Sequence, residues 1–205
     1  MLYLGNASAG KVREAMVAGD IGMMATPAEG KSPDPYPVWA ADNGCFGKGF
    51  PGEPAWMAWL EKLSPHADRC LFATAPDVVG DAEATLARSV PHLPAIRAMG
   101  YPAALVAQDG LEHLDVPWDA FDVLFIGGST EWKLGKAAAT LVTEAKARGK
   151  WVHMGRVNSR RRWSYAEHIG CDSCDGTFLA FGPDTNLPRL TNWISQSGFD
   201  FGAAS

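Results

Sequence analysis

The sequence lacks any long run of apolar residues. No stretch approaches the roughly 20 uninterrupted apolar residues that a membrane-spanning helix needs. The apolar start, residues 1–4, has no basic residues around it and is interrupted by Gly5 and Asn6. It is therefore interpreted as a strand and not as a signal peptide. These absences predict a soluble protein of the cytoplasm, or of the host cytoplasm for a phage-encoded chain.

Positive charge is also scarce. The chain has 18 Lys and Arg against 23 Asp and Glu, a net charge of −5, so no global positive field indicates nucleic-acid binding. The basic residues nevertheless gather locally, because a cluster falls within residues 156–162 and Lys133 lies near the start of an expected helix. Such a patch can bind a polyanion, or it can be a solvated helix face. The cluster consists of Arg156, Arg160, Arg161 and Arg162.

Cysteines are few. With no secretory signal, Cys45, Cys70, Cys171 and Cys174 are expected to be free thiols in a reducing compartment. The Cys171-x-x-Cys174 spacing lacks the second pair that a tetrahedral zinc site usually has, and His168 is the only nearby candidate ligand. A packing role is favoured over metal or redox chemistry.

Short apolar runs, each followed by turn residues and usually by a helical pattern, are abundant. The chain is 205 residues long and 47% hydrophobic, enough for one large domain covering residues 1–205. Apolar strands alternating with amphipathic helices are typical of a parallel sheet covered by helices. The eight runs are residues 2–4, 21–25, 38–41, 70–75, 103–107, 123–126, 151–154 and 171–177, and the helical stretches are 8–18, 54–63, 81–99, 130–148 and 159–169.

Eight strands predict a closed, compact (β/α)8 TIM-like barrel in the α/β class. Because about 250 residues is more usual for this fold, some strand connections are expected to lack a full helix. The alternative is a doubly wound open sheet. That fold usually has a glycine-rich phosphate-binding loop after the first strand, and residues 5–10 match such a loop only loosely.

Polar residues follow the expected strands where the active site of a parallel barrel lies. Asp42, Asp77, Gln108 and Asp175 fall at such ends, as does the pair Gly127-Gly128. Each has a structural alternative, because aspartate often caps a helix and glycine often forms a turn. Together they suit a site for a planar heterocycle with polar groups around its rim. Two separate carboxylates also suit displacement at an anomeric carbon.

The ordered series of motifs resembles the tRNA-guanine transglycosylase family. That family comprises the queuine and archaeosine enzymes and shorter phage and bacterial relatives that act on DNA guanine. The resemblance runs from about residue 39 to residue 177, and only the series, not a single motif, is specific. Its segments are Asp-Asn-Gly-Cys-Phe (42–46), Pro-Asp (76–77), Val-Ala-Gln-Asp-Gly (106–110), Ile-Gly-Gly-Ser (126–129), His-Met-Gly-Arg-Val (153–157) and Gly-Cys-Asp-Ser-Cys-Asp-Gly-Thr (170–177).

The resemblance implies roles for individual residues. Asp175 would be the nucleophile that forms a covalent glycosyl-enzyme, with Asp172 three residues away as the other acidic candidate, and Asp42 would be the general acid/base. Phe46 and Met154 would sandwich the base, and Asp77, Gln108, Gly127 and Gly128 would read its edge. Arg156, Arg160, Arg161, Arg162 and Lys133 would contact phosphates.

The departures from the family narrow the expected substrate. No cysteine follows Cys174, so the family's zinc site is expected to be absent, and no other metal or cofactor is expected. The chain has no room for the insertions that grip tRNA. The resemblance therefore implies exchange of guanine in DNA, rather than tRNA, for a 7-deazaguanine such as preQ0, and it leaves a homodimer open.

Two alternatives stand beside base exchange. A non-catalytic nucleic-acid-binding subunit would bind DNA without exchanging a base, although both Asp42 and Asp175 are present. A small barrel hydrolase or N-glycosidase acting on free nucleosides would bind no polymer, and charge reversal of Arg160, Arg161 and Arg162 would leave its rate unchanged.

Overall fold

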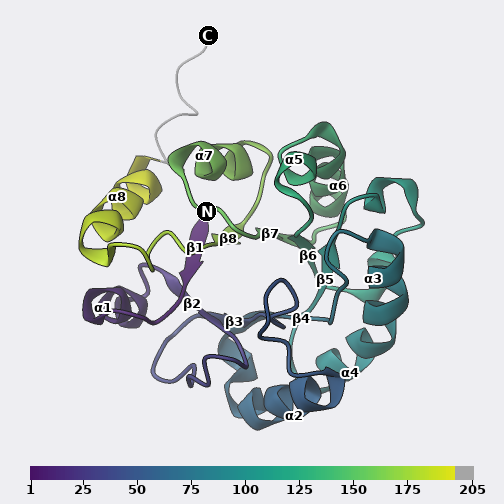
Figure 1. Ribbon diagram of the computed structural model, residues 1–205, viewed down its shortest axis with the longest axis horizontal. Coiled ribbons are helices and arrows are strands. Elements are labelled where there is room, and N and C mark those ends of the chain that lie inside the picture. Colours follow the sequence, from purple (N-terminus) through teal and green to yellow (C-terminus); the bar gives the residue numbers. More distant parts are fainter. Residues whose placement is uncertain (197–205) are drawn as a thin grey trace.

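The computed structural model describes residues 1–196, which form a closed barrel of parallel strands in sequence order (Figure 1). The barrel closes between the first and last strands, where Leu4 pairs with Asp175. The predicted α/β barrel is confirmed, and a strand forms at each of the eight apolar runs. The strands are β1 (Leu2–Gly5), β2 (Gly22–Ala25), β3 (Trp39–Ala41), β4 (Cys70–Thr74), β5 (Ala103–Ala107), β6 (Val123–Ile126), β7 (Trp151–Met154) and β8 (Ser173–Asp175).

Helices form an outer ring around the strands (Figure 1). As expected for a short barrel, two connections lack an α-helix: residues 26–38, between β2 and β3, contain no helix, and residues 108–122, between β5 and β6, contain only 3-10 turns. The helix after β8 was not predicted from the sequence and has Pro188 in its interior. The helices are α1 (Gly10–Ala18), α2 (Glu53–Leu63), α3 (Ala82–Ser89), α4 (Leu93–Ala98), α5 (Thr130–Lys133), α6 (Lys136–Ala147), α7 (Arg160–His168) and α8 (Pro183–Gln196), with 3-10 turns η1 (Ser64–Arg69), η2 (Val90–His92), η3 (Leu111–His113) and η4 (Trp118–Ala120).

Alternate residues of each strand face opposite sides of the barrel wall. One set packs outward against the helices, and the other fills the barrel interior. The interior set includes Leu4, Met24, Phe72, Val106 and Phe125. These side chains fill the barrel, and the loops that follow the strands converge above them, at the carboxyl ends of the strands.

Two local observations bear on the sequence predictions. The four cysteines are free thiols, as expected, and Cys171 and Cys174 are buried in the core. Among residues 1–196, no helix is long and apolar enough to span a membrane.

The start of α3 offers a test of the local hydrogen bonding. The Asp81 carboxylate accepts a hydrogen bond from the Ala84 amide at 3.0 Å, which satisfies one of the free N–H groups at the helix start. Asp81→Ala is expected to lower the free energy of unfolding by about 1 kcal/mol, whereas Asp81→Asn keeps the cap and most of the stability. Urea unfolding of the two variants measures the difference. Equal losses in both would show that the cap contributes nothing.

Candidate active site

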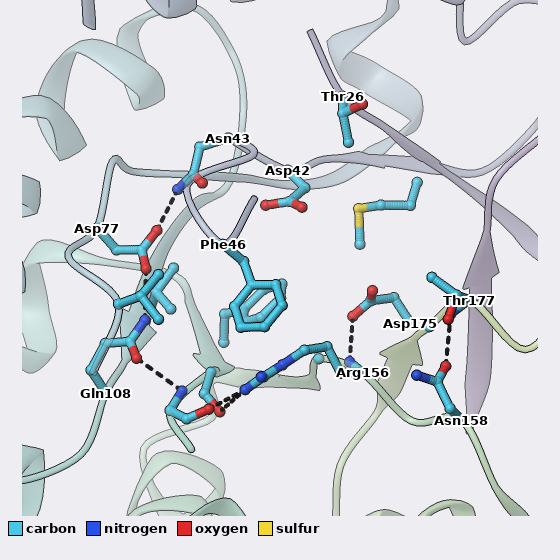
Figure 2. Close-up of a pocket in the computed structure, with 18 of the residues that line it drawn as sticks. Thr26, Asp42, Asn43, Phe46, Asp77, Gln108, Arg156, Asn158, Asp175 and Thr177 are labelled. Carbon is cyan, nitrogen blue, oxygen red and sulfur yellow. Dashed lines mark hydrogen bonds between the residues drawn. The ribbon is translucent and has the colours of Figure 1, made fainter. Parts of the chain in front are cut away.

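A cavity of about 330 Å³ opens at the carboxyl ends of the strands (Figure 2). Its walls come from the loops that follow most of the strands, which is where parallel barrels place their active sites. Six of the residues singled out in the sequence line it: Asp42, Phe46, Asp77, Gln108, Arg156 and Asp175. Gly127 and Gly128 line it too, beside Met24, Thr26, Asn158 and Thr177.

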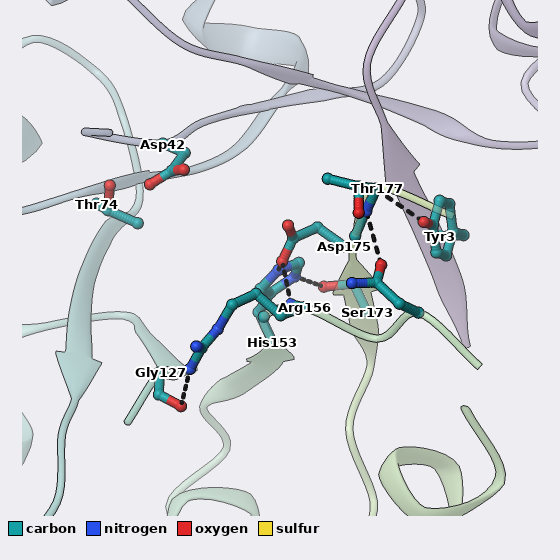
Figure 3. A network of polar contacts seen from close by, with 12 residues as sticks. Tyr3, Asp42, Thr74, Gly127, His153, Arg156, Ser173, Asp175 and Thr177 are labelled. Atoms are coloured by element: carbon teal, nitrogen blue, oxygen red, sulfur yellow. Dashed lines mark hydrogen bonds and ion pairs between the residues drawn. The ribbon is translucent and has the colours of Figure 1, made fainter. Parts of the chain in front are cut away.

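Asp42 and Asp175 face each other across this cavity from opposite parts of the chain (Figures 2 and 3). Burial and, next, the negative charge of Asp175 raise the pKa of Asp42 to about 7. Asp175 has donors directed at it: its Oδ1 accepts from His153 Nε2 at 3.1 Å and from the Arg156 amide at 3.3 Å. Near neutral pH, the Asp42 carboxyl is therefore held partly protonated, and the two carboxyl groups differ in their surroundings.

The Asp77 carboxylate belongs to a buried amide network at the far wall of the cavity. One oxygen accepts from Asn43 Nδ2 at 2.9 Å, and the other from Gln108 Nε2 at 2.6 Å. The Gln108 carbonyl in turn accepts from the amides of Gly80 and Gly128, each at 3.0 Å. Burial raises the pKa of Asp77, and these amide hydrogen bonds oppose the rise. The network fixes this wall of the cavity before any substrate arrives.

Removing Gln108 from this network should cost stability. Gln108→Met keeps the volume but leaves a buried Asp77 oxygen and two backbone N–H groups without their partner. We expect a loss of about 2 kcal/mol in the free energy of unfolding, measured by urea denaturation. Gln196→Met, on the exposed part of α8, is the control and should change it little. An equal effect of the two substitutions would contradict a structural role for the network.

Gly127 and Gly128 allow the backbone to approach the cavity closely. A side chain at Gly128 would meet the Trp132 ring at 2.5 Å, and its φ of +58° also favours glycine. A Cβ at Gly127 would lie 2.8 Å from Val106. Their carbonyl oxygens accept hydrogen bonds from the Arg156 guanidinium. The pair is thus a backbone acceptor edge of the site.

Phe46 is largely exposed at the mouth, and the Arg156 guanidinium stacks on its ring at 4.1 Å from the ring centre. Met154 does not face Phe46. It pairs in register with Cys174 on β8 and packs outward among the helices, fully buried. The predicted sandwich of Phe46 and Met154 is therefore corrected, because strand alternation directs Met154 away from the cavity. The methionine that lines the cavity is Met24 of β2.

The predicted basic patch is mostly engaged in internal contacts. Lys133 is fully buried and donates to the Gly155 carbonyl at 2.6 Å, so it cannot contact a phosphate at the surface. Arg160 donates to the Trp193 carbonyl and Arg162 to the Arg156 carbonyl. Arg161 is exposed. The prediction that Lys133 contacts a phosphate is therefore wrong, because Lys133 is buried. Arg156, another of the five residues predicted to contact phosphates, lies in the cavity wall.

His153 was missed by the sequence reading as a functional residue. It lies fully buried beneath Asp175, between the rings of Phe72 and Phe125 at 4.9 and 4.6 Å. Thr26, Asn158 and Thr177 were also missed. Each of these three residues lies shortly after the end of a strand, and this position alone is a weak indication of a functional role.

No group of three or more His, Cys, Asp or Glu side chains within residues 1–196 is arranged to hold a metal ion. The expectation that the chain uses no cofactor stays a prediction.

Comparisons with known proteins extend only to the fold. No protein-family model matches the sequence, and no curated protein matches it. Solved structures do match: 3-hexulose-6-phosphate synthase from Salmonella typhimurium, with 14% identity and a TM-score of 0.54 over 96% of this chain and 99% of that chain. KGPDC from Streptococcus mutans matches with 14% identity and a TM-score of 0.56 over 96% and 98%. At this identity the likeness establishes the barrel.

These comparisons contradict the resemblance to the tRNA-guanine transglycosylase family. The synthase and KGPDC are among the barrels that match nearly the whole chain, and no family model supports the motif series. That assignment is therefore wrong. The following predictions depended on it and are wrong as well: guanine exchange, the pentosyltransferase activity and the 7-deazaguanine substrate. DNA binding and a homodimer were implied by the same resemblance and stay untested predictions.

Proposed function

We propose that this chain is an enzyme that enolises a small, carbonyl-bearing sugar by general acid–base catalysis. Asp175 would act as the base and Asp42 as the acid. The observation that supports this is the unequal pair of carboxyl groups at one cavity: Asp42, with a pKa raised to about 7, and Asp175, which accepts hydrogen bonds from His153 and Arg156. A carboxyl group with a pKa raised to near 7 suits the role of the acid, and the second carboxyl group at the same cavity is then available as the base.

The proposed reaction balances within the pair. Asp175 takes a proton from the carbon next to the carbonyl, the electron pair of that C–H bond forms the C=C bond, and the carbonyl oxygen takes the proton of Asp42. The product is an enediol, with Asp175 protonated and Asp42 ionised. If Asp175 returns its proton to the neighbouring carbon while Asp42 takes one from the other hydroxyl, the sugar is isomerised and both carboxyl groups regain their first states.

Polar groups around the two carboxyls suit a substrate with several hydroxyls. Thr26 and Thr177 supply hydroxyls and Asn158 an amide on the same side of the cavity (Figure 2). Arg156 supplies a cation opposite them, which suits an anionic group such as a phosphate. The cavity of about 330 Å³ lies within the usual range for small-molecule sites. One structural neighbour is named for a sugar phosphate, so sugar phosphates are the first compounds to test.

Proton exchange in heavy water tests the proposal without knowledge of the product. A panel of aldose and ketose phosphates is incubated with the protein in D2O and followed by proton NMR. We expect loss of the signal from the hydrogen next to the carbonyl for one or a few members of the panel, and no loss with Asp175→Asn. Exchange that persists in Asp175→Asn, or no exchange with any carbonyl sugar, would overturn the proposal.

A further inference from the structure

A line of hydrogen-bonded side chains runs through the barrel interior from its floor to Asp175. Figure 3 shows the upper part of this line, from Ser173 through His153 to Asp175. Trp151 Nε1 lies 2.8 Å from Ser173 Oγ, and Ser173 Oγ lies 2.8 Å from His153 Nδ1. His153 Nε2 lies 3.1 Å from Asp175 Oδ1. The line ends at the amino-terminal edge of the barrel, where Trp151 is 36% exposed.

The strand register explains this alignment. Trp151 and His153 alternate on β7, Ser173 and Asp175 alternate on β8, and His153 pairs with Ser173. All four therefore face the barrel interior. His153 and Ser173 are fully buried, and the rings of Phe72 and Phe125 flank the imidazole. In such surroundings, a polar group without a hydrogen-bond partner would be costly, so each proton in the line has a defined place.

The chemistry of Trp151 fixes the direction of every bond in the line. An indole N–H can only donate, so Ser173 Oγ accepts from it. The Ser173 hydroxyl proton is then directed to His153 Nδ1, which must be the unprotonated nitrogen. His153 Nε2 carries the hydrogen and donates to Asp175. The opposite tautomer would leave the serine proton without an acceptor among these residues and would set a bare nitrogen against a carboxylate.

We propose that Trp151 and Ser173 are positioning residues that fix the Nε2–H tautomer of His153 and thereby orient the Asp175 carboxylate. Because the indole N–H does not ionise near neutral pH, the line does not conduct protons to the floor of the barrel. Any proton that Asp175 takes must leave through the cavity. The effect of this positioning on catalysis rests on the proposed function of Asp175. The tautomer of His153 does not depend on that function.

The tautomer is measured by two-bond proton–nitrogen NMR correlation on protein with labelled histidines. The chain has five histidines, and His153→Gln identifies the signals of His153. We expect a protonated Nε2 and an unprotonated Nδ1 at neutral pH. Ser173→Ala should shift the population toward the Nδ1–H form, and Ser173→Thr should restore the original one. A wild-type His153 that carries its proton on Nδ1, or on both nitrogens, would overturn the proposal, as would an unchanged tautomer in Ser173→Ala.

Kinetics supply the second readout. Once the sugar screen identifies a substrate, Ser173→Ala and Trp151→Phe should each lower kcat by about 10- to 100-fold with little change in KM. Tyr101→Phe is the matched control, because it also removes one buried hydroxyl hydrogen bond, to the Leu60 carbonyl, far from Asp175 in the sheet. Equal losses of kcat in Ser173→Ala, Trp151→Phe and Tyr101→Phe would show that the line of hydrogen bonds contributes only to stability. If no sugar reacts, the NMR result still decides the tautomer, so the two proposals fail separately.

Discussion

Replacement of Asp175 by asparagine is expected to lower kcat at least about 10³-fold, with the protein still folded. Asparagine has nearly the same shape, and its carbonyl oxygen can still accept from His153 Nε2 and from the Arg156 amide. Its amide nitrogen, however, cannot take a proton from substrate. The loss should therefore fall on turnover and leave KM close to that of the wild type.

The control for Asp175→Asn is Asp115→Asn, an exposed aspartate outside the cavity. It should leave kcat unchanged. Isotope exchange and thermal unfolding are measured on both variants side by side. An Asp175→Asn protein that is folded and exchanges protons at the wild-type rate would remove Asp175 from the chemistry.

Asp42→Asn should stabilise the protein at alkaline pH. The pKa of Asp42 is raised to about 7 in the folded chain against 3.8 in the unfolded chain, so the folded state binds more protons between these values. Its contribution to stability is therefore lost as pH rises through this window and stays lost above it. The difference of about three pKa units corresponds to roughly 4 kcal/mol as an upper limit. Because Asp42 keeps some contact with solvent in the cavity, about 2–4 kcal/mol is expected.

Urea unfolding at pH 4 and pH 8 tests this sign. The stability gain of Asp42→Asn over the wild type should be small at pH 4 and largest at pH 8. Asp68→Asn, an exposed aspartate, should show no such dependence. A gain that is equal at both pH values, or a loss at pH 8, would show that Asp42 is not held in its protonated form. As the proposed acid, Asp42 also predicts that kcat falls as pH rises above about 7.

The barrel and the location of its site could be predicted because they depend on coarse patterns. Most strands are short apolar runs with polar residues at or directly after their ends, as at Asp175 and Asp42. Parallel strands bring all such ends to one face. Asp77 and Gln108 meet in the cavity wall for the same reason. The order of elements along the chain was thus enough to bring distant residues together.

The direction of individual side chains could not be predicted in the same way. A strand buried on both faces has apolar residues at every position, so the sequence does not show which alternate set faces inward. Met154 was expected in the cavity, and it is His153, one residue earlier, that faces the interior. Lys133 looked like a surface cation, because nothing in the sequence indicates that the Gly155 carbonyl accepts its proton.

The family resemblance was misleading for a related reason. Aspartate after a strand, paired glycines and a glycine–arginine turn serve the geometry of parallel barrels in general. In this chain Gly128 makes room for Trp132, and the Arg156 amide contacts Asp175. Motifs with such structural causes can recur in the same order without a shared reaction.

The packed interior beneath the site has a kinetic consequence. Leu4, Met24, Phe72 and Phe125 are buried and fill the barrel below the carboxylates, and the cavity opens at the strand ends. Whatever enters at the strand ends must depart by the same opening. Reactant and product would therefore exclude one another, and accumulated product should inhibit competitively, raising the apparent KM while the limiting rate stays constant.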